Sequence, residues 1–326
     1  MKRLAWTLGT LAVLAALDSL LPRILDPYVF QVLMLCGINV VLAVSLNLIN
    51  GFTGQFSIGH AGFMAVGAYA SAMFSLCIGE GWSRQLAGLG APAALAHGAP
   101  LLVALLAGGA AAAVAGYLVG LPSLRLRGDY LAIVTLGFGE IIRVVITNVD
   151  AVGASRGLPG IPGWGSFFWV GLGVVSVIVL SLRIAGSTHG RALFAIRDDE
   201  VAAESLGVDT TRYKVLAFVI GAFFAGVAGG LFAHYLSYLN PNTFTFIKSF
   251  EVMAMVVLGG LGSVTGAVVA AIVLTLLPEV LRPIKDFRMV IYALMLIVLM
   301  IARPQGLFGS RELSWTWIRR KTARAT

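Results

Sequence analysis

The stretch GRALFAIRDDEVAAESLGVDTTRYK, residues 190–214, decides how the rest of this chain is interpreted. It is the longest run that could not lie in hydrocarbon, because each charged side chain would cost a few kcal/mol or more at bilayer depth. The runs on both sides are apolar. Within the stretch, small and apolar residues recur at helical spacing, and Gly207 follows Leu206 where a helix would end. The pattern predicts a short amphipathic helix between two membrane spans.

Two interpretations of this helix remain open on the pattern alone. It is either a solvated loop helix that is held by its own charge pairs, or a docking surface for a partner. The helical positions that support both interpretations are Ala192, Ala195, Ile196, Ala203 and Leu206.

Composition places the chain among polytopic membrane proteins. Of its 326 residues, 59% are hydrophobic and only 12% are charged, whereas soluble domains carry roughly 25% charged residues. A net charge of +8 would suggest a nucleic-acid partner in a soluble protein. Here the basic residues lie mainly at span ends and in the tail, so the expected partner is the lipid bilayer and no nucleic acid.

Apolar runs set the expected order of spans. We expect residues 79–100 to form a loop, and a break at 259–263 (GGLGS) to divide the run 252–277 into two short segments. The first run follows Lys2 and Arg3 and lacks a small-x-small cleavage site before Asp18, which favours an uncleaved span over a secretory signal. The runs are 4–21, 28–49, the run from His60, 101–120, the run from Tyr130, 167–182, 215–238, 252–277 and 289–301.

The distribution of basic residues predicts the orientation. If both chain ends, the turn at Arg125 and Arg127 and the charged loop are all cytoplasmic, the spans between them must be even in number. Dividing 252–277 satisfies this condition and gives about ten segments. One unbroken helix there would place the basic tail outside.

Polar residues within the spans are candidates for a translocation path. Amides in a span are costly unless paired, and a Gly-rich break such as 51–59 is tolerated at membrane depth only where protein or a water-filled cavity covers it. Alternatively, the break is a surface loop and the Glu140–Arg143 couple is structural. The candidates are Asn39, Asn47, Asn50, Gln55, Ser57, His60, Glu140 and Arg143.

The order G-R-A-x-x-A-I-R-x-x-E-x-A-A-x-x-x-G, which begins at Gly190, resembles the "EAA" cytoplasmic loop of ABC-importer permeases in its branched-chain amino acid (LivM-type) version. Four further motifs are similar to the same family in the same order. They are GQFSIGHAGFMAVGAYASA from Gly54, LRGDYLAIVTLGFGEIIR from Leu126, VVLGGLGSVTGA from Val256 and RPQGLFG from Arg303. Together these motifs are spread along the chain between residues 39 and 309.

The resemblance implies an all-α polytopic membrane protein with broken helices and a cytoplasmic coupling helix that fits a cleft of an ATPase. It implies a permease domain over 1–310, with the coupling loop at 186–214, and a basic cytoplasmic tail over 311–326. Arg191, Arg197, Asp198 and Glu200 would hold the helix in the ATPase cleft by charge-assisted hydrogen bonds. The coupling residues are Gly190, Arg191, Ala192, Ile196, Arg197, Asp198, Glu200, Ala203, Leu206 and Gly207.

The implied machine is an importer in a bacterial inner membrane, made of this permease, a second homologous permease, two ATPases and a periplasmic solute-binding protein. The chain has no G-x-x-x-x-G-K-[ST] loop, so ATP and Mg are expected on the partner ATPases and no cofactor in this chain. No metal-ligand spacing or nucleophilic triad is evident, and the chain is not expected to be an enzyme.

Two other functions remain open. The same machinery could import urea, amides or aromatic acids, because the binding protein largely sets specificity in such systems. An ion-coupled carrier or channel would instead use Glu140, Arg143 and His60 as a charge relay, and would have no need of a docking helix.

Overall fold

The computed structural model describes residues 2–90, 92–123 and 128–282, together with the isolated positions 293, 294, 297, 301, 306, 307 and 309. The turn at Arg125 and Arg127, most of the last apolar run and the tail 311–326 lie outside the described residues. Nearly every described segment is helical, as the sequence predicts for this class.

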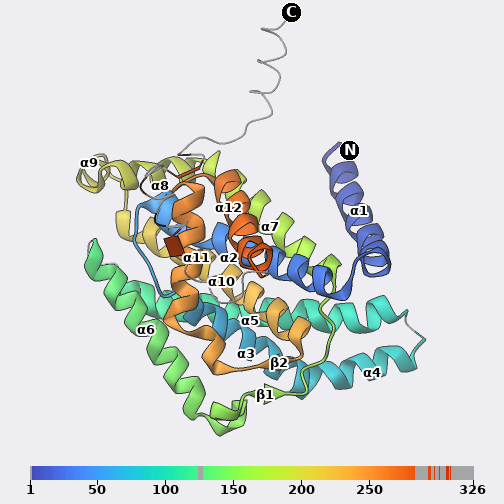
Figure 1. Ribbon diagram of the computed structural model, residues 1–326. Coiled ribbons are helices and arrows are strands. Elements are labelled where there is room, and N and C mark those ends of the chain that lie inside the picture. Colours follow the sequence, from blue (N-terminus) through green and yellow to red (C-terminus); the bar gives the residue numbers. More distant parts are fainter. Residues whose placement is uncertain are drawn as a thin grey trace, which may run out of the picture.

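Figure 1 shows the order and arrangement of the elements. One antiparallel pair of two-residue strands, β1 (Leu158–Pro159) and β2 (Tyr238–Leu239), joins two loops. The helices are α1 (Lys2–Ile24), α2 (Pro27–Thr53), α3 (His60–Phe74), α4 (Glu80–Gly88), α5 (Ala93–Ser123), α6 (Asp129–Asn148), α7 (Phe167–Ala185), α8 (Thr188–Asp198), α9 (Glu200–Ser205), α10 (Thr210–Leu236), α11 (Phe246–Gly259) and α12 (Val264–Val280).

The centre of the bundle is formed by α2, α3, α5 and α10, which supply most of the buried apolar side chains. Small residues bring these helices together at backbone distance. A methyl group on Gly67 of α3 would overlap the backbone of Gly226 on α10, and one on Gly229 would overlap the carbonyl of Met64. This glycine seam therefore leaves no room for side chains between α3 and α10.

Six helices in the described part of the chain are long and apolar enough to cross a membrane. They are Pro27–Thr53, His60–Gly88, Leu95–Pro122, Asp129–Asn148, Phe167–Ala185 and Thr210–Leu236, with Val264–Val280 as a shorter apolar helix. The chain is thus a multi-pass membrane protein.

The predicted loop at 79–100 was wrong. A π-helical turn, Ser75–Gly79, carries α3 directly into α4, and α5 already begins at Ala93. The Gly and Pro residues on which the prediction rested lie mostly at the helix ends, while Pro100 is accommodated inside α5. Alanine, which fills much of this stretch, has the strongest helix propensity.

The predicted division of 252–277 is confirmed. Two helices, α11 and α12, pack against each other on either side of a turn at 260–263. Gly260 and Gly262 adopt φ values of 106° and 88°, which side chains rarely allow. The amide of Leu307 donates to the carbonyl of Leu258 at 2.7 Å, so the chain after the last apolar run returns to the end of α11.

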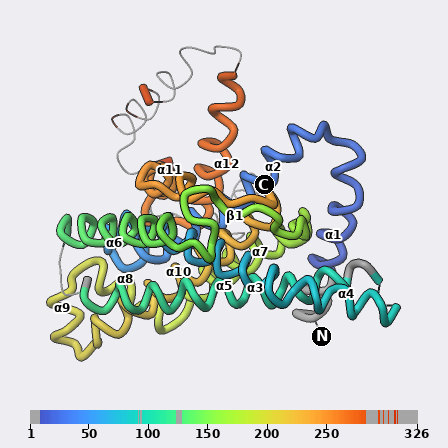
Figure 2. Tube along the Cα trace, turned by 90° about the horizontal axis from the view of Figure 1, so that it is seen from below, coloured from blue at the N-terminus to red at the C-terminus, as the bar shows by residue number. Residues whose placement is uncertain are grey.

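The outer helices define the two ends of the molecule. The short helices α8 and α9 lie at one end and α4 at the other in both views (Figures 1 and 2). Helix α1 stands at the edge of the bundle and contacts mainly α7, where the Asp18 carboxylate accepts a 3.0 Å hydrogen bond from the amide of Phe168.

Candidate functional site

The charged segment 190–207 is two helices and not one. The Asp199 carboxylate accepts hydrogen bonds from the amides of Val201 (2.9 Å) and Ala202 (3.0 Å) and caps α9, while its own backbone is extended at φ −158°. An aspartate side chain that accepts hydrogen bonds from nearby backbone amides favours the start of a new helix over continuation of the previous one. The prediction of a single helix was therefore wrong. The predicted end is confirmed, since Gly207 has φ +84°.

One face of this segment packs on the membrane bundle. Ile196 and Ala203, which we expected among the coupling residues, are buried together with Leu193. Gly190 is also buried, and a side chain there would overlap the backbone at Ile184. These residues fix the segment to its own chain.

Arg197 connects the segment with the broken part of the bundle. Its guanidinium donates to the carbonyl of Gly51 at 3.2 Å, close to the end of α2. It also pairs with Asp198 at 3.2 Å and lies 5.2 Å from the ring centre of Phe194. A Cβ on Gly262 would meet the guanidinium at 2.8 Å. Arg197 therefore lies where α8, α2 and the turn 260–263 converge.

Glu200 is also engaged within the chain. Its carboxylate pairs with the ammonium of Lys214 on α10 at 2.6 Å, and the Lys214 side chain is only 8% exposed. Glu204 accepts a 3.1 Å hydrogen bond from Thr210 on the same helix. The segment is thus tied to α10 as well as to α2, and neither Arg197 nor Glu200 is a free surface charge.

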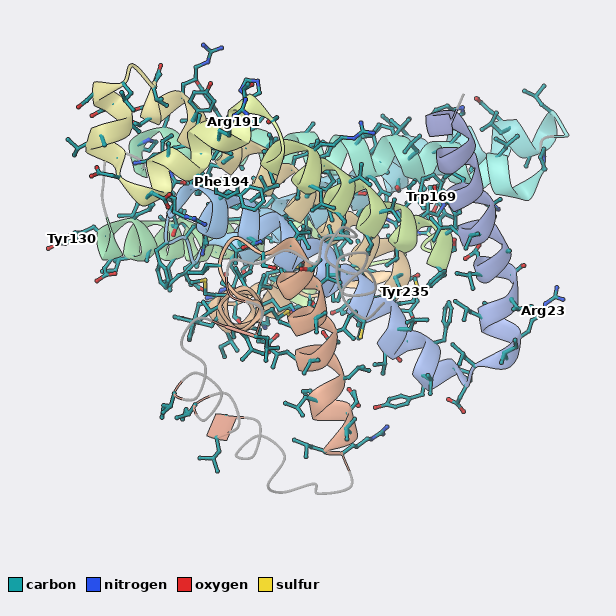
Figure 3. The ribbon with its side chains drawn as sticks, turned by 90° about the horizontal axis from the view of Figure 1, so that it is seen from above. Arg23, Tyr130, Trp169, Arg191, Phe194 and Tyr235 are labelled. Carbon is teal, nitrogen blue, oxygen red and sulfur yellow. The ribbon has the colours of Figure 1, made fainter. Side chains whose placement is uncertain are left out.

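The outer face of the segment is exposed and partly apolar. Leu206 is 84% and Val201 60% exposed, beside exposed Arg191 and Asp198. Ala192 is half-buried. Figure 3 shows Arg191 and Phe194 on α8 near one edge of the molecule, far from Arg23 on α1. The sequence analysis did not single out Val201. Its position was a usable signal, because Val201 does not fall on the helix face that carries Ile196 and Ala203.

The break after α2 is packed mostly inside the protein, although Gly54 and Phe56 are exposed. Asn50 donates to the carbonyl of Ser57 and accepts from its amide, both at 3.2 Å, and so replaces a backbone partner. The Ile58 amide donates to Thr135 of α6 at 3.1 Å. Gln55, at 5% exposure, and Ser57 are buried.

Asn47 and His60 extend this polar interior. Asn47 accepts a 2.9 Å hydrogen bond from the amide of Gly262, which ties α2 to the turn between α11 and α12. A ring nitrogen of His60, Nε2, lies 2.8 Å from the hydroxyl of Ser45. In the described part of the chain, several buried polar atoms lack a partner, among them Asn47 Nδ2, both amide atoms of Gln55, Ser57 Oγ and His60 Nδ1.

Glu140 and Arg143 form an ion pair at 2.8 Å, and each side chain is about a quarter exposed (26% and 25%). The other carboxylate oxygen of Glu140 accepts from the amide of Phe246 at 2.9 Å. Phe246 is the first residue of α11, whose N-cap Thr245 makes no side-chain cap hydrogen bond. Glu140 thus caps a neighbouring helix, which is a structural task.

Asn39 belongs to a different group, away from the break. Its amide donates to Thr275 on α12 at 2.9 Å and accepts from the ammonium of Lys248 on α11 at 3.2 Å. Lys248 also pairs with Glu251 at 3.2 Å. The sequence analysis did not include Lys248 and Glu251 among the candidates for the path. Opposite charges three residues apart in an apolar stretch were the missed signal.

Among the described residues, no group of three or more His, Cys or acidic side chains is arranged to hold a metal ion. The site is instead a helical segment that is attached to the bundle through Arg197 and Glu200, and the bundle beside it has buried polar side chains.

The chain is similar to known transport proteins. Residues 28–301 match the family described as "Branched-chain amino acid transport system / permease component". The chain is 37% identical to the high-affinity branched-chain amino acid transport system permease protein LivM of Salmonella typhimurium over 83% of its length and 67% of that protein's. The LivM of Escherichia coli is equally similar, at 37% identity over the same shares.

The LivH permease protein of the same Escherichia coli system is 25% identical over 84% of this chain and 92% of its own length. No solved structure matches the chain significantly. A family model that extends over residues 28–301, together with the shared membrane-spanning helices, shows that the chain belongs to the branched-chain amino acid transport permeases, which are not enzymes.

Proposed function

We propose that this chain is a permease subunit of an ATP-binding cassette importer that carries branched-chain amino acids across a bacterial inner membrane. The LivM and LivH proteins that it resembles are named for that transport. The observation that carries the coupling part of the proposal is an exposed apolar residue, Leu206, on a segment that is otherwise pinned to the bundle.

The outer face of α8 and α9 would dock on an ATPase subunit. Leu206 and Val201 would fill an apolar cleft, and Arg191 and Asp198 would form charge-assisted hydrogen bonds at its rim. Displacement of this segment would act at two places in the bundle. Arg197 would pull on the end of α2 and the turn 260–263, and the Glu200–Lys214 pair would act on α10.

The topology that fits this function has about ten segments with both ends in the cytoplasm. The end of α2, the turn 260–263 and the coupling segment 186–214 would share the cytoplasmic side, because Arg197 touches all three. The loop 148–165 would then lie outside, with the permease domain over 1–310 and the basic tail over 311–326 inside.

Four kinds of partner follow from the proposal. A second permease, of which the LivH proteins are the model, would complete the path. Two ATPases would bind ATP and Mg, and a periplasmic binding protein would deliver the solute. Solute release would proceed by alternating access through the polar interior around Asn47, Asn50, Gln55, Ser57 and His60.

Two other functions compete with this one. Import of urea, amides or aromatic acids would use the same machine with another binding protein. An ion-coupled carrier would need Glu140 and Arg143 for proton or ion relay, but Glu140 is occupied by Arg143 and by the amide of Phe246. The capping role of Glu140 argues against the carrier.

The test is uptake of labelled leucine into vesicles by the chain alone and by the chain with the second permease, the ATPases and the binding protein. ATP-dependent uptake only with the full set is the expected result. Hydrolysis of ATP without leucine uptake would mean the machine is right and the substrate wrong. Uptake by the chain alone, insensitive to ATP, would overturn the proposal in favour of a carrier.

The docking face is tested by Leu206→Glu in the same full set. We expect assembly with the ATPases and leucine uptake to be lost while the amount of protein in the membrane stays unchanged, since a charge cannot enter an apolar cleft unpaired. Arg212→Ala, at another exposed position near the start of α10, is the matched control. Normal assembly of the Leu206 variant would show that this face does not dock.

A further inference from the structure

A lysine, a glutamate and an asparagine meet beside α2, about halfway along its length. Lys248 donates to Asn39 and pairs with Glu251, both at 3.2 Å, and Asn39 in turn donates to Thr275 at 2.9 Å. These residues come from three helices, α2, α11 and α12. Among the described residues, this cluster shares no side-chain hydrogen bond with the break at 54–59 or with the Glu140–Arg143 pair, although Glu140 caps the same helix, α11.

The depth of the cluster follows from the length of α2. Asn39 lies near the middle of Pro27–Thr53, so about 20 Å of helix separates it from either end at 1.5 Å per residue. Substrate sites of transporters built from broken helices lie near this depth. A charge pair there is costly and indicates a function unless it is sealed inside the protein.

The cluster is not sealed. Lys248 is 21% and Glu251 45% exposed, and Ile247, one turn before Glu251 on the same face of α11, is 57% exposed. A carboxylate exposed to this degree cannot face lipid at the midplane without a large cost. This face of α11 must therefore line a wet path, or a cavity that a partner closes.

The cluster also has unused hydrogen-bonding capacity. An ammonium group has three donors, and Lys248 uses one on Asn39 and one on Glu251. Within the described residues, Glu251 is bonded through Oε2 alone, so its Oε1 remains available. An acceptor and a donor of opposite charge, side by side, match the carboxylate and ammonium of an amino acid zwitterion.

We propose that Lys248, Glu251 and Asn39 bind the zwitterionic backbone of the transported amino acid as it crosses the membrane. Lys248 binds its carboxylate, Glu251 accepts from its ammonium, and Asn39 holds Lys248 in place. The apolar solute side chain lies against Ile247, one turn before Glu251 on α11. This inference rests on the proposed function, because it gives the solute of that importer a site at the membrane midplane.

The first test measures leucine moved per ATP hydrolysed by the reconstituted importer. We expect Glu251→Gln and Lys248→Met each to lower this ratio by about tenfold or more, with assembly and the ATPase activity stimulated by the loaded binding protein kept within about twofold. Glu80→Gln, which breaks the exposed 2.9 Å pair with Arg84, is the control and should change neither.

The outcomes separate this inference from the proposed function. If the unmodified importer moves no leucine, the proposed function fails before any variant is made. If the unmodified importer works and both variants keep its ratio of leucine to ATP, the zwitterion site is wrong. A parallel fall of assembly, ATPase activity and uptake would overturn it as well, because an ion pair that only supports the fold produces that result.

A second test asks whether the site is wet. In a Cys77→Ser background, which removes the exposed native thiol, Glu251→Cys should react with a charged thiosulfonate reagent, and turnover with leucine should slow the reaction. Ile272→Cys, on an apolar face of α12 at 38% exposure, should not react. Absence of labelling at position 251 throughout turnover of the assembled importer would show that the pair never faces water and would overturn the proposal.

Discussion

Arg197 joins the charged segment 190–207 to the membrane bundle. It donates to the carbonyl of Gly51 and lies against Phe194, whose ring is 5.0 Å from that of Phe52. Polar and aromatic contacts thus join α8 to the last turn of α2. In the proposed function, a motion of the segment would be transmitted to the bundle through this side chain.

Replacing Arg197 by Ala should uncouple the importer. The guanidinium supplies a charge-assisted hydrogen bond of about 1.5–3 kcal/mol to Gly51, so we expect leucine uptake to fall at least tenfold while ATP hydrolysis continues. The measurement is the ratio of uptake to hydrolysis in proteoliposomes. Arg212→Ala should leave the ratio unchanged, and an equal effect of the two variants would contradict a specific role for Arg197.

Replacing Glu140 by Ala should weaken the fold more than the transport. The variant loses both the Arg143 ion pair and the acceptor for the Phe246 amide, which together are worth about 1–3 kcal/mol. We expect a lower Tm in detergent and near-normal uptake per folded molecule. Loss of uptake at an unchanged Tm would instead indicate that Glu140 acts in the translocation path. Glu80→Ala, in an exposed pair, serves as the control.

Residue types could be predicted from the sequence, but their partners could not. Polar amides such as Asn47 and Asn50 stood out in an apolar run, yet their partners are the amides of Gly262 and Ser57. Backbone groups carry no sequence signal. Lys248 and Asn39 lie 209 positions apart in the sequence, and only the packing of α11 on α2 brings them together.

At the scale of elements, the division between α8 and α9 depends on Asp199. The sequence predicted the end at Gly207, because glycine permits the left-handed conformation found there. It did not predict the interruption, since Asp199 fits a helix pattern as an exposed position. Three consecutive acidic residues after Arg197 were the available hint, because aspartate is a preferred N-cap.

Asp199→Ala should loosen α9 without unfolding the bundle. Loss of the cap costs about 0.5–2 kcal/mol of local stability, so the amides of Val201 and Ala202 should exchange hydrogen faster. Leucine uptake should fall in proportion as the docking face loses order. Asp199→Asn keeps a capping oxygen and should behave nearly as the unmodified chain does. Identical exchange in all three proteins would show that the cap has no such role.

At the scale of the whole molecule, the glycine seam between α3 and α10 sets a strict steric limit. Gly67→Ala should sharply lower the yield of folded protein, because its methyl group would overlap the Gly226 backbone and overpacking costs about 1–3 kcal/mol or more. Gly137→Ala on α6 meets no atom within 4 Å and should be tolerated. The measurements are the folded yield and the Tm in detergent of the Gly67 and Gly137 variants, and equal values for the two would contradict the steric limit.

The orientation of the whole chain can be tested with single cysteines in a Cys77→Ser background. Asp150→Cys, in the loop after α6, should react with an impermeant reagent in intact spheroplasts, because that loop is expected outside. Thr211→Cys, at the exposed start of α10, should react only after permeabilisation. Reaction of both from the same side would refute the proposed topology.

The sequence predicted the order of the spans better than their packing. Apolar runs located α2, α6, α7 and α10 to within a few residues, and the GGLGS break located the turn between α11 and α12. It did not indicate that α10 lies against α2, α3 and α5. Glycine positions on α10 predicted close packing, but any helix with small residues could have been the partner.

The glycine seam also determines how this bundle can move. Helices in backbone contact cannot move apart without losing their packing. We therefore expect α3 and α10 to rotate together as one rigid body. Since α10 has 27 residues, it is about 40 Å long. A shift of about 4 Å at its loop end is then a tilt of about 6°. We expect movement of the ATPases to reach the far side of the membrane as such a tilt, while α3 and α10 stay packed against each other.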